Sequence, residues 1–227
     1  MAYEFQINVP TTARDIKLGQ WQKYAEIYEK NKDNTNRDFL SLKMLEIFCG
    51  VSLNDSHKLP ISTFDAILEH LGELLNENTP RVNRFNLIGS DDVELKLGLL
   101  PNLDKMTYGE WEDLENYIFD QKNLHRAMAV LYRPLVYQIG GKYRVHEYKG
   151  TDFYADLMKE MPIDIALGAR VFFYRLVKKL GDYTMDSILN QYQKEKETNS
   201  EAVLEKNGEV IQQYLNLRKE ISGELTK

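Results

Sequence analysis

Hydrophobic residues recur every three or four positions along most of the chain, a spacing that predicts amphipathic helices. In the first third, Trp21, Tyr24 and Tyr28 share one face of such a stretch, and Gly50 is suited to end a later one. A short alternating segment that precedes them predicts a strand. The elements expected in this part are a strand over residues 5–9 and helices over residues 16–30, 37–49 and 63–75.

Two later stretches alternate between apolar and polar positions around a centre of turn-forming residues, which is the pattern of a β-hairpin. The first is centred on Gly89-Ser90-Asp91-Asp92 and the second on Gly140-Gly141. Helical periodicity returns between the hairpins and after them. The expected strands cover residues 82–88, 93–100, 135–139 and 143–148, and the expected helices cover 107–120, 123–132 and most of the chain from 151 onward.

These elements predict a mainly helical α+β protein. We expect two related strand–helix–helix units, two β-hairpins and a helical C-terminal part. Three segments result from this division. They are residues 1–80, with the N-terminal strand and three helices, residues 81–134, with a hairpin and the second helix–helix unit, and residues 135–227, with a hairpin and C-terminal helices packed with the preceding unit.

An internal repeat supports the two related units. Leu18-Gly19-Gln20-Trp21 corresponds to Tyr108-Gly109-Glu110-Trp111, and apolar residues follow each tryptophan at the third and seventh positions. We expect each glycine to let a neighbouring backbone approach, and each tryptophan to bury its ring against the following helix. Gly19, Trp21, Gly109 and Trp111 are therefore the expected core of the repeat, and a binding role for either tryptophan is the alternative.

Composition and charge narrow the class of protein. The chain has 43% hydrophobic and 28% charged residues, which is typical of a globular protein. Its 29 basic and 35 acidic residues give a net charge of −6, so we expect no nucleic acid as main partner. The single cysteine, Cys49, forms no internal disulfide and suits a reducing compartment. Without a secretory signal or a long apolar run, we expect a soluble protein with no membrane partner.

Motifs of known chemistry are missing from the sequence. It contains no phosphate-binding loop, no dinucleotide-binding glycine pattern, no zinc-binding His-Glu-x-x-His and no cysteine pair. The four histidines lie far apart, and the acidic residues between 110 and 115 suit the first turns of a helix without any chemistry. We therefore expect no catalytic residue, no cofactor and no metal, and a protein that is not an enzyme.

Two groups of residues are candidates for binding another protein. Tyr137, Tyr143 and Tyr148 gather at the second hairpin, and tyrosine is enriched at protein interfaces, although a half-buried sheet face explains them equally well. The second group is a basic helix face, which suits an acidic protein partner or simple solvation. It consists of Arg175, Lys178 and Lys179.

Five segments together resemble a group of tailed-bacteriophage proteins that are encoded with virion structure and assembly genes in phages of Bacteroidetes-type hosts. The resemblance spans roughly residues 10–180 and transfers no catalytic residue. The segments are Asp15–Tyr24, Leu42–Gly50, Met106–Leu114, Leu124–Pro134 and Met161–Ala169.

The resemblance implies a non-enzymatic virion assembly or structural protein that works through protein–protein contacts, such as a tail-assembly chaperone or a neck or tail component. Its partners would be other phage structural or assembly proteins, and it would act in the host cytoplasm during assembly. A place in the finished virion and a homo-oligomeric state both stay open. The alternatives are a small phage-encoded enzyme and an accessory protein that contacts DNA through the basic helix face.

Overall fold

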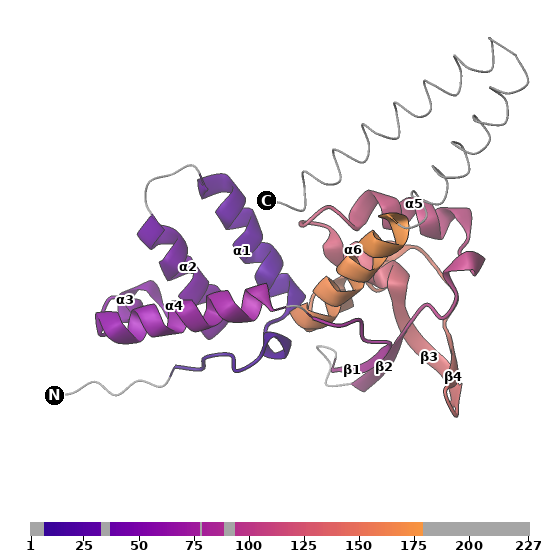
Figure 1. Cartoon of the computed structure of the whole chain (residues 1–227), viewed down its shortest axis with the longest axis horizontal. Coiled ribbons are helices and arrows are strands. Elements are labelled where there is room, and N and C mark those ends of the chain that lie inside the picture. The colour runs from indigo at the N-terminus through magenta and orange to yellow at the C-terminus, as the bar shows by residue number, and fades with distance from the viewer. Residues whose placement is uncertain (1–6, 33–36, 78, 89–93, 179–227) are drawn as a thin grey trace, which may run out of the picture. The chain divides into compact units, whose positions relative to one another are not determined.

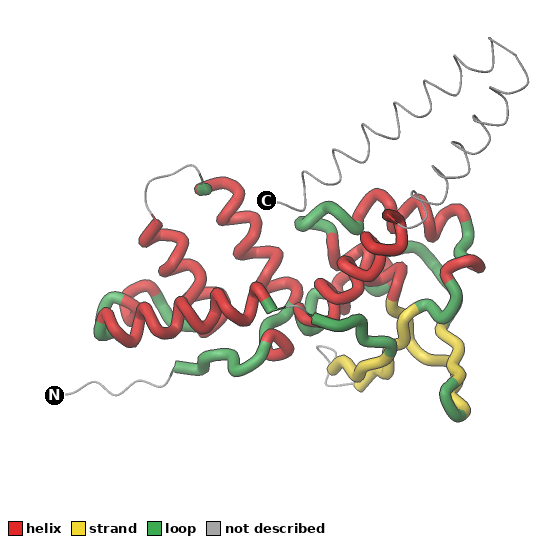
Figure 2. Tube along the Cα trace, viewed as in Figure 1, coloured by secondary structure: helices red, strands yellow, loops and turns green. Residues whose placement is uncertain are grey.

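A computed structural model of the chain describes residues 7–32, 37–77, 79–88 and 94–178. The chain divides into two compact units, residues 1–171 and 172–227, and only residues 172–178 of the second are described. The boundaries expected at residues 80 and 134 thus fall inside one unit. The first unit is mainly helical with one antiparallel sheet, which confirms the predicted α+β class (Figure 2).

The first part of the chain is helical (Figure 1). A short 3-10 turn, η1 (Ala13–Asp15), precedes four helices, in which Leu45, Ile67 and Leu71 are buried. Gly50 takes a φ of +68° directly after the second of them, so the predicted helix end is confirmed. The helices are α1 (Leu18–Asn31), α2 (Arg37–Cys49), α3 (Leu53–Ser56) and α4 (Ile61–Asn76).

The strand expected over residues 5–9 is not formed in the part that is described. Residues 7–9 have no regular structure, and the sheet contains no strand from this end of the chain. An extended segment needs a neighbouring strand to satisfy its backbone groups. The backbone bridge nearest to this segment instead joins Lys17 to Pro162, with Leu18 N donating to Met161 O at 2.7 Å.

The sheet has four antiparallel strands in the order β1-β2-β3-β4. The strand pairing of both predicted hairpins is confirmed, although the turn expected at residues 89–92 lies outside the described residues. The third strand begins three residues earlier than expected, directly after a helix. Two-residue periodicity is hard to detect there because Tyr132, Arg133 and Pro134 are all buried. The strands are β1 (Arg84–Ile88), β2 (Glu94–Leu99), β3 (Tyr132–Ile139) and β4 (Lys142–Val145).

The core of the second half is α6 (Leu124–Leu131), where every residue except Arg126 is buried. It packs against α5 (Tyr108–Tyr117) and runs directly into β3. The apolar stretch Ala127–Leu131 allows this burial on all sides. Three short helical elements lie before and after these helices in the chain, and a helix over residues 163–178 follows them. The short elements are η2 (Leu103–Lys105), η3 (Thr151–Phe153) and α7 (Ala155–Met158).

Candidate functional site

The repeated Gly-x-Trp segments begin their helices in the same way. In α1, Gln20 Oε1 accepts a hydrogen bond from Lys17 N at 2.9 Å. In α5, Glu110 Oε2 accepts one from Thr107 N at 2.7 Å. Each pair closes a capping arrangement that satisfies an amide left free by the helix start. The residue between the glycine and the tryptophan therefore has the same capping role in both copies of the repeat.

The same two side chains also reach the end of the following helix. Gln20 Nε2 donates to Ile47 O near the end of α2 at 2.8 Å. Glu110 Oε1 accepts from Arg133 Nη2, just beyond α6, at 2.6 Å. Both links tie the first turn of one helix to the end of its antiparallel neighbour. The sequence comparison found the repeat but missed this role, because the bonded partners lie 27 and 23 residues away.

The four residues expected to form the repeat core differ in their surroundings. A Cβ on Gly19 would lie 3.1 Å from Lys159 Cβ and 3.2 Å from Lys159 O, so a close approach does require glycine there. A Cβ on Gly109 would meet nothing within 4 Å. Trp21 is half-buried, but Trp111 is 37% exposed. The close approach expected at Gly109 is thus not found among the described residues, and the core position expected of Trp111 stays a prediction.

A buried ion pair anchors the second hairpin to α5. The side chains of Arg133 and Glu110 are 3% and 6% exposed. Arg133 Nη1 also donates to His146 O at 3.1 Å, so one guanidinium joins both strands of the hairpin to the helix. Its Nε is buried and has no hydrogen-bond partner among the residues that the structure describes. Removing either charge would leave the other uncompensated in the core.

Two of the three candidate interface tyrosines form hydrogen bonds at the base of the hairpin. The Tyr148 hydroxyl donates to Asp113 Oδ2 of α5, and burial together with this bond raises the pKa of Tyr148. The Arg133 guanidinium also lies over the Tyr148 ring, with its Cζ 5.7 Å from the ring centroid. The Tyr143 hydroxyl donates to Leu99 O of β2 at 2.7 Å. Only Tyr137 keeps an exposed side chain, so the three do not form one outer face.

Beyond this anchor, the hairpin separates from the rest of the sheet. Pairing between β2 and β3 runs from Leu99 opposite Tyr132 to Leu97 opposite Pro134 and stops there. Proline has no amide hydrogen to donate, which explains the end of the ladder. Residues 135–139 then pair only with β4. The tip is therefore a two-stranded hairpin that extends away from the helices (Figure 1).

This tip exposes apolar side chains, and we define it as residues 135–145. Val136, Tyr137 and Ile139 are all exposed, Ile139 at 76%. The chain turns at Gly140, whose φ of +59° suits a tight turn. An isolated hairpin is marginally stable in water, but this one is held at its base by the Arg133 anchor. The result is a braced element that presents apolar area to its surroundings.

The predicted basic face is described only in part. Arg175 and Lys178 are exposed on the helix over residues 163–178. Lys179 lies outside the described residues.

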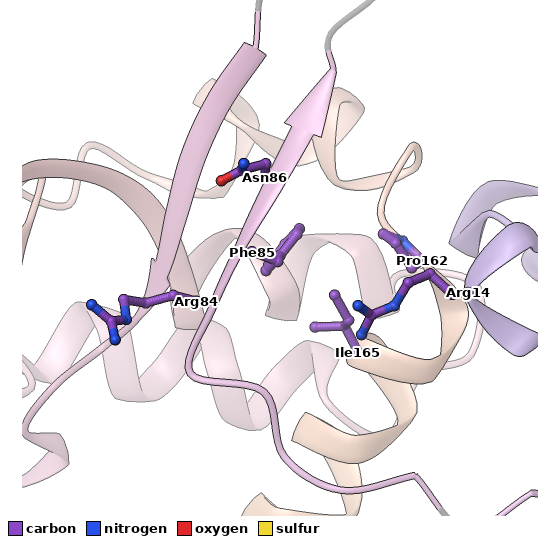
Figure 3. Close-up of a pocket in the computed structure, with 6 residues that line it drawn as sticks. All are labelled: Arg14, Arg84, Phe85, Asn86, Pro162 and Ile165. Atoms are coloured by element: carbon purple, nitrogen blue, oxygen red, sulfur yellow. The ribbon is translucent and has the colours of Figure 1, made fainter.

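One open hollow of about 330 Å³ lies beside β1 (Figure 3). Arg84, Phe85 and Asn86 line one side, and neither tryptophan takes part. Arg14, on the opposite side, already donates from Nε and Nη2 to Asp164 Oδ2 at 3.1 and 2.9 Å. Its positive charge is thus balanced within the chain. The remaining lining residues are Pro162 and Ile165.

The buried titratable groups lie in packing positions. Burial lowers the pKa of His125, and the positive charges of Lys159 and Arg126 lower it further. Its Nδ1 lies 3.1 Å from Gln22 Nε2, which donates to two backbone carbonyls between α5 and α6. Burial also raises the pKa of the Cys49 thiol to about 11, which makes it a poor nucleophile.

Within the ranges that the structure describes, no group of three or more His, Cys, Asp or Glu side chains could hold a metal ion. In the same ranges, no helix has the length and apolar character needed to cross a membrane.

Comparison of the chain with protein-family models, curated proteins and solved structures finds no match. The likeness to tailed-phage proteins therefore stays a prediction from sequence. The braced hairpin with its exposed apolar side chains is the structural feature that bears on function.

Proposed function

We propose that this protein is a non-enzymatic virion assembly or structural protein of a bacteriophage and that it acts through protein–protein contacts. A tail-assembly chaperone and a neck or tail component both fit this role. The observation that supports it is the hairpin tip, where Val136, Tyr137 and Ile139 expose apolar side chains on a braced support. The sequence resemblance adds the phage context.

A partner bound at the tip would remove its exposed apolar side chains from water. Apolar side chains gathered on a projecting element mark an interaction surface more often than isolated ones do. The base of the hairpin is fixed by the Arg133–Glu110 pair and by the bond from Tyr143 to Leu99 O. A fixed base lowers the entropic cost of docking, because the tip is ordered before the partner arrives.

Capture of phage proteins with a hairpin variant tests this function. Tagged wild-type protein and Ile139→Asp are expressed in host cells infected with the parent phage, and bound proteins are identified by mass spectrometry. Ile61→Asp is the matched control, because Ile61 is 72% exposed on α4, outside the hairpin. We expect wild type and control to capture the same structural or assembly protein, and Ile139→Asp to lose it. Capture of no phage protein by wild type contradicts the proposal.

Mass spectrometry of purified virions then separates the two roles. A neck or tail component stays in the particle, whereas a chaperone occurs only with assembly precursors in the host cytoplasm. Presence of the protein in neither preparation contradicts both roles.

A further inference from the structure

One face of the hairpin tip combines apolar and positively charged side chains. Tyr137 lies opposite Arg144 and Ile139 opposite Lys142, and residues directly opposite each other in an antiparallel pair share a face. All four side chains are exposed. Lys142 has no ion pair within the described residues, and Arg144 reaches only Glu147, at 3.7 Å. We call these four residues the hairpin face.

The outer side of α5 has the complementary character. Tyr108, Trp111, Glu112 and Glu115 follow each other at helical spacing, so they share one side of the helix. Tyr108 is 80% exposed, and both glutamates are exposed and form no ion pair with another side chain that the structure describes. The opposite side of α5 buries Leu114. We call these four residues the α5 face.

We propose that the hairpin face of one copy of this chain docks onto the α5 face of a second copy. The proposal rests on the proposed function, since it names a partner for the same hairpin. Two cations and two apolar side chains would meet two carboxylates and two aromatic side chains. The sizes agree, because residues 108–115 span about 10 Å of helix and two steps along a strand cover about 7 Å.

The two faces do not meet within one chain. The base of the hairpin is bonded to α5, and Ile139 lies six residues beyond Arg133, about 20 Å along an extended strand. Figure 1 shows the tip pointing away from α5. The contact therefore joins different copies, and because the two faces differ it is a head-to-tail contact. Repetition of such a contact produces a ring or a filament.

The distribution of charge favours this head-to-tail contact over a symmetric contact between two β4 edges. Each chain carries a net charge of −6, so copies repel each other unless patches of opposite sign meet. Pairing of two β4 edges would place Lys142 and Arg144 of one copy beside those of the other. Like charges opposite each other destabilise a strand pair. The hairpin face against the α5 face brings together opposite charges instead.

A charge-swap experiment tests the contact. One variant carries K142E/R144E and a second carries E112K/E115K. Each variant alone opposes two faces of like charge, whereas a 1:1 mixture restores opposite charges at every contact of an alternating assembly. Sedimentation velocity over a range of concentrations measures the association at low and high salt. E69K/E73K is the matched control, since it reverses two exposed acidic residues on α4.

We expect wild type and E69K/E73K to associate with rising concentration, and each hairpin or α5 variant to associate about tenfold more weakly or not at all. The 1:1 mixture should regain wild-type association, and high salt should weaken it. Circular dichroism verifies that each variant folds. If a charge-reversal variant fails to fold, the neutral variant K142Q/R144Q or E112Q/E115Q takes its place, and a smaller loss of association is expected. The inference is overturned if wild type stays monomeric, if the 1:1 mixture does not associate, or if E69K/E73K loses as much association as the hairpin and α5 variants.

These results separate the inference from the proposed function. If wild type stays monomeric while Ile139→Asp still loses a captured phage protein, only the second-copy contact is wrong. If the charge-swap mixture assembles while no phage protein is captured, the self-contact stands and the proposed function is wrong.

Discussion

Glu110→Gln tests the buried ion pair most directly. The amide keeps an oxygen for Thr107 N, as Gln20 does for Lys17 N in the first copy of the repeat, so the helix cap is preserved. The negative charge beside Arg133 is lost together with the hydrogen bond from Arg133 Nη2, because the amide nitrogen that replaces Oε1 cannot accept one. Two unit charges about 4 Å apart interact by about 4 kcal/mol at the effective dielectric constant of protein interiors. Breaking a buried pair by removing one partner costs about 3–5 kcal/mol.

Urea unfolding followed by circular dichroism gives the free energy of unfolding for wild type and variant. We expect Glu110→Gln to lower the free energy of unfolding by about 3–5 kcal/mol, a large part of the stability of an ordinary domain. The double variant E110Q/R133M removes the orphaned cation as well and should recover most of the loss. A loss below about 1 kcal/mol refutes the reasoning, because the pair would then behave as an exposed one. Failure of the double variant to recover refutes it too.

Two further predictions concern the repeat and the buried histidine. Gly19→Ala should lower the melting temperature, with a cost of about 1–3 kcal/mol from its clash with Lys159, whereas Gly109→Ala should leave it unchanged or raise it. Because the pKa of His125 is lowered in the folded state, its contribution to stability is present above the unfolded pKa near 6.5 and is lost as the pH falls below it. Urea unfolding at pH 7.5 and pH 5 should therefore show a larger loss for wild type than for His125→Gln, and equal losses contradict this.

Local patterns were sufficient to predict most of the fold. Helical spacing located α1, α2, α5 and α6, and Gly140-Gly141 located the turn of the second hairpin. These signals depend on neighbouring residues alone. The expected strand is not formed at residues 7–9, its described part, because a strand also needs a partner, and alternation in the sequence carries no information about one.

The site was less predictable because its contacts join distant positions. The concentration of tyrosines in the sequence pointed to the second hairpin, which is the region of the candidate site. The sequence did not indicate that Tyr143 and Tyr148 bond inward, to Leu99 O and to Asp113. Glu110 was interpreted only as an acidic residue suited to a helix start, since its partner Arg133 lies 23 residues away in an apparently apolar stretch.

The direct passage from α6 into β3 makes the hairpin a lever. Leu131 ends the helix and Tyr132 begins the strand, so no flexible linker separates them. A pull on the tip is transmitted along the strand to the most deeply buried helix of the unit. Mechanical load from a docked neighbour would therefore be borne by the hydrophobic core, where resistance to deformation is greatest.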